Sequence, residues 1–88
     1  MITGVNHHFE FEGTDYHIQI EDISDAYALE VRVYVGGAVL FQKRQPYEGL
    51  IMELPDTRDA EMVLQEEMAK LINLVQAAIR KGRITAKK

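Results

Sequence analysis

The sequence predicts an α+β fold, in which a four-stranded antiparallel β-meander of two hairpins packs against one long C-terminal α-helix. Residues 5–20 and 29–45 alternate apolar and polar side chains on both sides of a glycine-containing turn, which is typical of a β-hairpin. Residues 58–81 repeat apolar side chains at three- and four-residue spacing, which is typical of an amphipathic helix. Sequential strands usually lie side by side, so we expect the strand order 1-2-3-4.

The composition is that of one small globular domain. The chain has 88 residues, of which 47% are hydrophobic and 27% charged. We expect a single domain over residues 1–82 and a basic, disordered tail over residues 83–88. The chain begins without a basic segment followed by an apolar run, so we expect neither a signal peptide nor a membrane span. It has no cysteine, which excludes disulfides and thiolate chemistry and fits a cytoplasmic protein.

Charge is unevenly distributed along the chain. The formal net charge is −4, but all 14 carboxylates lie in residues 1–79 together with only five Lys and Arg, so this part carries −9. Residues 80–88 carry +5. An acidic body repels the phosphate backbone of nucleic acids, whose binding depends on cationic contacts. The charge pattern therefore disfavours nucleic acid as a partner, and contact through the basic tail is the weakest of the functional hypotheses.

The first hairpin is expected to turn at Gly13-Thr14. Glycine at the first central position of a two-residue loop favours a type II′ turn, because glycine accepts a positive φ. This turn places Glu12 opposite Asp15 and brings the large apolar residues of both strands to one face. The other face is polar.

That polar face carries the candidate functional cluster. It consists of His8, Glu10, His17, Gln19 and Glu21. In the expected register Glu10 faces His17 and His8 faces Gln19. Imidazoles beside carboxylates can bind a metal or act in acid–base catalysis. However, polar outward residues are the rule in antiparallel sheets, and a catalytic zinc site needs three converging ligands. We therefore assign no catalytic residue, metal or cofactor, and keep a small-ligand, metal-binding or enzymatic site here as an alternative.

The second hairpin is expected to turn at Gly36-Gly37. This turn opens a strand, whereas a phosphate-binding glycine loop normally opens a helix, so a phosphate site is disfavoured. If Val35 pairs with Ala38, then Tyr34 meets Val39, Arg32 meets Phe41 and Glu30 meets Lys43 on the face turned away from the helix. That face is therefore expected to be apolar near the turn. An exposed apolar patch of this kind needs a cover, which could be a partner subunit, a segment of the chain or a ligand.

The long helix should begin with Asp56 or Thr57 as N-cap and end before Gly82, which suits the C′ position. Its core stripe is Leu64, Met68, Leu71, Ile72, Val75, Ala78 and Ile79. About 24 residues give a helix of roughly 36 Å, whereas a seven-residue strand spans roughly 24 Å, so the helix should extend beyond the sheet. The candidate interface of a homodimer combines apolar residues of the helix and the second hairpin: Tyr34, Val39, Phe41, Met62 and Leu74.

One part of the sequence resembles a group of short bacterial domains without assigned biochemistry. The resemblance rests on the run Gly13-x-x-Tyr16-His17-Ile18-Gln19-x-Glu21-Asp22, then Gly36-Gly37-x-Val39-Leu40, then Tyr47, although Gln45-Pro46 stands where the group has a small hydroxyl residue. The resemblance implies a bacterial cytoplasmic protein or accessory domain. The residues it marks are Tyr16, His17, Gln19, Glu21 and Asp22.

Together these patterns favour a small non-catalytic module for protein interaction and dimerisation. Enzymatic activity is disfavoured, because no nucleophile is placed by a motif and no cofactor fingerprint occurs. A homodimer is the expected assembly, and another protein partner is an open possibility.

Overall fold

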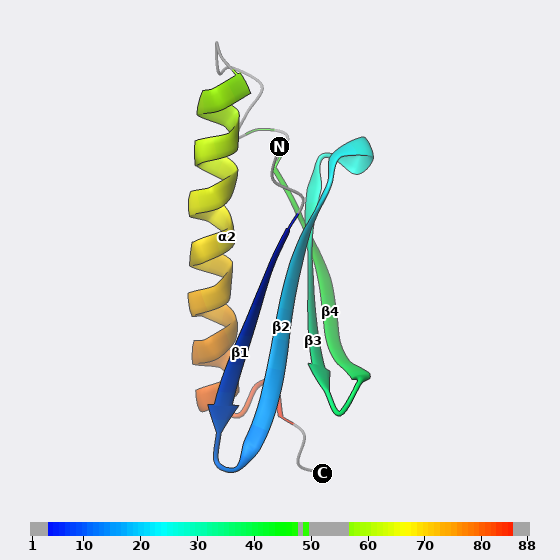
Figure 1. Ribbon diagram of the computed structural model, residues 1–88, viewed down its shortest axis with the longest axis vertical. Coiled ribbons are helices and arrows are strands. Elements are labelled where there is room, and N and C mark those ends of the chain that lie inside the picture. Colours follow the sequence, from blue (N-terminus) through cyan, green and yellow to red (C-terminus); the bar gives the residue numbers. More distant parts are fainter. Residues whose placement is uncertain (1–3, 48, 50–56, 86–88) are drawn as a thin grey trace.

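A computed structural model describes residues 4–47, 49 and 57–85. The elements are β1 (Gly4–Phe11), β2 (Thr14–Ile23), the short 3-10 helix η1 (Ser24–Ala26), β3 (Ala28–Val35), β4 (Ala38–Pro46) and α2 (Thr57–Arg80). The four strands form one antiparallel sheet in the order β1-β2-β3-β4. Helix α2 runs along one face of this sheet, and its first turn extends past the sheet at the top of the view in Figure 1. The predicted fold class and strand order are confirmed.

The first hairpin turns one residue earlier than expected, at Glu12-Gly13. Both residues have positive φ, 52° and 80°, which is the signature of a type I′ turn. Phe11 therefore pairs with Thr14, and Phe9 with Tyr16. The expected type II′ turn at Gly13-Thr14 was wrong. It assigned a positive φ to Gly13 alone, whereas Glu12 adopts a positive φ as well. The pairing moves by two residues, so each side chain stays on its predicted face while its cross-strand partner changes.

The second hairpin turns at Gly36-Gly37 as expected, with φ of 60° and 84°. Beyond the turn a β-bulge interrupts the register, because Tyr34 pairs with Val39 but Val33 pairs with Phe41. Leu40 is the extra residue. The bulge reverses the expected face of Phe41, whose side chain packs against the core between sheet and helix. We placed Phe41 on the outer face because the alternation of residues 38–45 contains no sign of the insertion.

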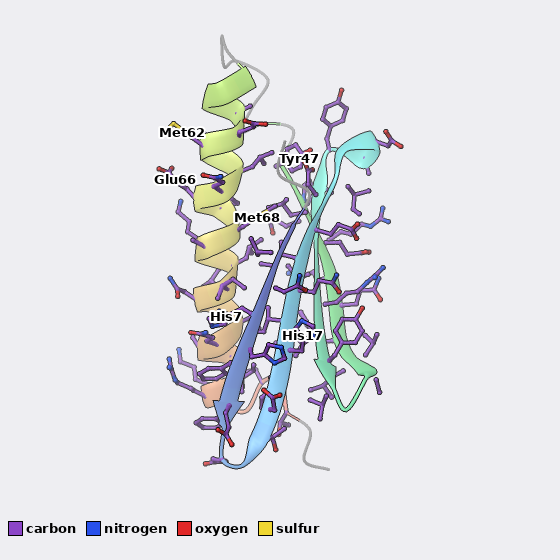
Figure 2. The ribbon with its side chains drawn as sticks, viewed as in Figure 1. His7, His17, Tyr47, Met62, Glu66 and Met68 are labelled. Carbon is purple, nitrogen blue, oxygen red and sulfur yellow. The ribbon has the colours of Figure 1, made fainter. Side chains whose placement is uncertain are left out.

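The core lies between the sheet and α2. Its buried members are Tyr16, Ile18, Ile20, Leu29, Val31, Val33, Tyr47, Leu64, Met68, Leu71, Val75, Ile79 and Ile84. Ile72 and Ala78 are partly buried against this cluster, so the predicted helix stripe is confirmed. Figure 2 shows Met68 pointing toward the sheet and Met62 pointing away from it.

Helix α2 ends in a Schellman motif at Gly82, whose φ is +78°. The amide of Gly82 donates to the carbonyl oxygen of Ile79 at 3.1 Å, and the amide of Arg83 donates to that of Ala78 at 2.9 Å. The chain then turns back, and the side chain of Ile84 is buried in the core. Ile84 belongs to the segment for which the sequence predicts a disordered tail. Residues 86–88 of that tail, and the alternative N-cap Asp56, lie outside the described residues.

Candidate functional site

A row of three rings crosses the outer face of the sheet, on the side opposite α2. In a two-residue turn the flanking pair Phe11–Thr14 is hydrogen-bonded, and hydrogen-bonded pairs alternate with non-hydrogen-bonded ones. His8 and His17 are therefore a non-hydrogen-bonded pair, in which side chains lie closest. Their ring centroids are 4.5 Å apart and their planes differ by 9°. Tyr34 of β3 continues the row, with its centroid 5.9 Å from that of His17.

Polar side chains hold the two imidazoles. Nε2 of His17 lies 3.2 Å from Oδ1 of Asn6, at hydrogen-bond distance. Nδ1 of His8 lies 3.4 Å from Oδ2 of Asp15, which forms an ion pair when the imidazole is protonated. An open depression of about 450 Å³ lies beside the rings. It is lined by His8, Asp15, His17, Gln19, Tyr34, Gly36 and Gly37.

The structure brings together only part of the predicted cluster. His8, His17 and Gln19 line the depression, whereas Glu10 and Glu21 do not. The expected pairs Glu10–His17 and His8–Gln19 are wrong, because the earlier turn pairs Glu10 with Asp15 and Gln19 with Asn6. Our sequence reasoning missed Asn6, Asp15 and Tyr34 as neighbours of the imidazoles. The correct turn would have identified the first two, since it fixes every pair of β1 and β2.

The geometry of the ring row limits its chemistry. Parallel stacked imidazoles direct their nitrogen atoms side by side, whereas a metal needs ligands that converge on one point. Over residues 4–47, 49 and 57–85, no group of three His, Cys, Asp or Glu side chains is placed to hold a metal ion. The depression beside the row can offer ring edges and the side-chain amide of Gln19 to a small polar ligand.

A buried carboxylate lies farther along the same face. Glu30 is only 4% exposed, although the outer face is open to solvent. Its Oε2 accepts hydrogen bonds from Nε2 of Gln42 at 3.0 Å and from Nε of Arg44 at 3.3 Å, and its Oε1 lies 2.7 Å from Nη2 of Arg32. The Gln42 hydrogen bond is the largest cause that lowers the pKa of Glu30, and the two arginines add to it against the opposing effect of burial. The bulge at Leu40 makes this network, because it brings Arg44 opposite Glu30 in place of the expected Lys43.

We expect Glu30→Gln to lower the free energy of unfolding at pH 7 by about 2 kcal/mol, because two arginines lose their shared carboxylate. A lowered carboxylate pKa stabilises the fold above its ordinary value of 4.5 and ceases to do so as the pH falls through the folded-state pKa. The difference in free energy of unfolding between wild type and variant should therefore become smaller below pH 4.5. Urea unfolding at several pH values measures this. Glu66→Gln removes an exposed carboxylate of α2, which lies on the other side of the sheet from this network, and is the control for the substitution itself.

Tyr47 and Asp22 lie where β4 and β2 end, away from the two hairpin turns. The phenol of Tyr47 donates to Oδ1 of Asp22 at 2.6 Å, and the amide of Tyr47 donates to the carbonyl oxygen of Tyr27 at 2.9 Å. Burial, followed by the hydrogen bond to Asp22, raises the pKa of Tyr47 to about 12. This hydrogen bond joins two side chains that lie 25 positions apart in the sequence, and it ties the chain after β4 to the end of β2.

We expect Tyr47→Phe to lower the free energy of unfolding by about 1 kcal/mol at pH 7, through loss of the hydrogen bond to Asp22. Because the pKa of Tyr47 is raised from 10.0 to about 12, its contribution is fully present below pH 10 and is lost as the pH rises toward 12. The unfolding curves of wild type and variant should thus converge across this window. Tyr27→Phe, at a phenol whose residue is 47% exposed, is the control. A difference in free energy of unfolding that stays constant up to pH 12 would contradict the raised pKa of Tyr47.

Two grooves flank α2 on the other face of the sheet. The first, about 540 Å³, lies between β1 and α2 and is lined by Gly4, Val5, Asn6, His7, Gln65, Met68, Ala69, Ile72 and Asn73. His7 Nε2 at its rim accepts a hydrogen bond from Nε2 of Gln76 at 2.7 Å. The second, about 200 Å³, lies on the β4 side and is lined by Val31, Phe41, Lys43, Gln45, Leu71, Leu74, Val75, Ala78 and Ile84.

The five candidate interface residues do not share one surface. Phe41 and Leu74 line the groove on the β4 side. Tyr34 and Val39 form a pair on the outer face of the sheet. Met62 projects from α2 away from the sheet (Figure 2). Val39, Met62 and Leu74 are 53%, 59% and 64% exposed, so three of the five leave large apolar side chains in water.

Comparisons with known proteins add no relatives. No family model, curated protein or solved structure matches the chain. In the described part of the chain, no helix is both long and apolar enough to cross a membrane.

Proposed function

We propose that this protein is a small non-catalytic module for protein interaction that forms homodimers. The observation that carries the proposal is the incomplete cover around α2. The helix buries its core stripe and leaves a groove on each side. Leu74 is exposed in the groove on the β4 side, and Met62 is exposed outside both grooves. A domain of this size has a small core, and association is a common way to bury more apolar surface.

The setting that we propose is the bacterial cytoplasm. It is supported by the resemblance to short bacterial domains and by the lack of cysteine in all 88 residues. The groove that holds Phe41 and Leu74 offers a further surface for a different protein. Contact with nucleic acid through the basic residues after position 80 remains the weakest alternative, because the body of the chain is acidic.

We expect the full chain to associate into dimers at micromolar concentrations. Sedimentation equilibrium over a series of concentrations measures the mass directly and separates a dimer from larger assemblies. A protein that stays monomeric into the millimolar range would contradict the proposal, because a specific interface of ordinary size buries enough surface to associate well below that concentration.

A small-ligand site on the outer face is the second candidate, favoured by the depression beside His8 and His17. Under our proposal the ring protons of both histidines should show no saturable NMR shift when Zn²⁺ or inorganic phosphate is added at constant pH. His7, which lies on the other face, is an internal control. A saturable shift at His8 and His17 alone, at submillimolar ligand, would favour the second candidate instead.

A further inference from the structure

The two edges of the sheet differ in how they are protected against pairing. Edge strands expose unpaired backbone groups, and natural proteins block them with bulges, lysines or prolines. Strand β4 carries all three, with the bulge at Leu40, Lys43 and a terminal Pro46. Strand β1 reads GVNHHFEF and pairs with β2 without a register shift, so it has none of these features. Within the described residues, β1 is therefore the edge that remains open to another strand.

The type I′ turn determines which backbone groups of β1 are available. Because the pair Phe11–Thr14 is hydrogen-bonded, the odd-numbered residues of β1 direct their N–H and C=O groups toward β2. The even-numbered residues Gly4, Asn6, His8 and Glu10 direct theirs to the free edge. All four are exposed.

The groove beside this edge carries no charge. Gly4–His7 form one wall, and the other wall comes from the side of α2 that faces β1. The helix residues that line the groove are Gln65, Met68, Ala69, Ile72 and Asn73, none of them charged. The nearest cation on this side is Arg80, whose guanidinium lies over the ring of Phe9 at 5.0 Å from its centroid, beyond the end of the groove. The half-buried side chains of Val5 and Ile72 extend from the core into this groove. A second copy of the chain presents the same neutral, partly apolar wall, so the two walls can lie side by side without bringing like charges together.

We propose that β1 pairs in antiparallel orientation with β1 of a second copy, so that two sheets join into one of eight strands with both helices on the same face. The proposal rests on the dimerisation proposed above and specifies its interface. Antiparallel pairing of a strand with itself is generated by a two-fold axis, so one surface satisfies both partners. The same operation sets the uncharged helix walls of the two grooves beside each other over the new strand pair.

The favoured register places the two-fold axis at His7. Only registers that pair even-numbered with even-numbered residues join the free N–H and C=O groups of both copies. With His7 on the axis, Val5 faces Phe9 of the second copy on the helix side. Glu10 faces Gly4, which keeps like charges apart. Both half-buried residues, Val5 and Phe9, would then gain cover.

A proline tests the role of the β1 backbone. Asn6→Pro removes an N–H that faces the free edge but leaves the hydrogen bonds between β1 and β2 intact. We expect it to raise the Kd of the dimer by roughly tenfold or more, because a backbone hydrogen bond across the interface is lost and its carbonyl partner is left unpaired. Asn6→Ala loses the contact with His17 but keeps the N–H, and should leave the Kd within about twofold of wild type. Circular dichroism verifies that both variants are folded.

Single cysteines locate the interface, because the natural chain has none. His7→Cys at the two-fold axis should give a disulfide-linked dimer on mild oxidation, since directly opposed strand residues lie within disulfide reach. Val39→Cys tests the outer face of the sheet, and Leu74→Cys tests the groove on the β4 side. Both variants should form disulfide-linked dimers only slowly. These measurements do not depend on whether Asn6→Pro folds.

The outcomes separate this inference from the proposed function. A dimer in sedimentation that links through His7→Cys and is weakened by Asn6→Pro supports both. A dimer that links through Val39→Cys or Leu74→Cys but not through His7→Cys overturns the β1 interface and leaves dimerisation standing. A protein that is monomeric at millimolar concentration overturns both.

Discussion

The left-handed pair Glu12-Gly13 is the constraint on which the rest of the sheet depends. With both residues at positive φ, the turn fixes every partner along β1 and β2. It makes His8 and His17 a close pair, so that their rings stack on the outer face. It also decides which backbone groups of β1 face β2 and which face solvent. One local choice of backbone conformation thus shapes both the ring row and the open edge.

Periodicity was sufficient to predict the four strands and the helix, and the faces of β1, β2 and α2. The alternation of β1 and β2 survives a shift of two residues, so the division into core and outer side chains was right although the turn was wrong. The stripe of α2 was right because it depends only on the 3.6-residue repeat. The C-terminal end of α2 was equally predictable, because Gly82 can adopt the left-handed backbone that a Schellman motif requires.

The contacts of the candidate site were less predictable, because they depend on irregular backbone. A bulge at Leu40 leaves no mark in the alternation of β4, yet it decides that Arg44 meets Glu30 and that Phe41 faces the helix. The pair Tyr47–Asp22 similarly depends on the chain path after Tyr27, a non-glycine residue with φ of 49°. Neither left-handed residue, Glu12 or Tyr27, belongs to a type that commonly adopts this backbone.

The contact between His7 and Gln76 spans 69 residues of sequence, whereas each strand pairs with its immediate neighbour in the chain. The meander can therefore form from local contacts, but its apolar face stays open until α2 docks. During synthesis, residues 4–46 leave the ribosome well before residues 57–80, and domains usually complete their folding only when all their elements are available. The order of elements thus creates a period in which a nascent sheet exposes its core face. Until the helix docks, that apolar face is a surface through which nascent chains can aggregate.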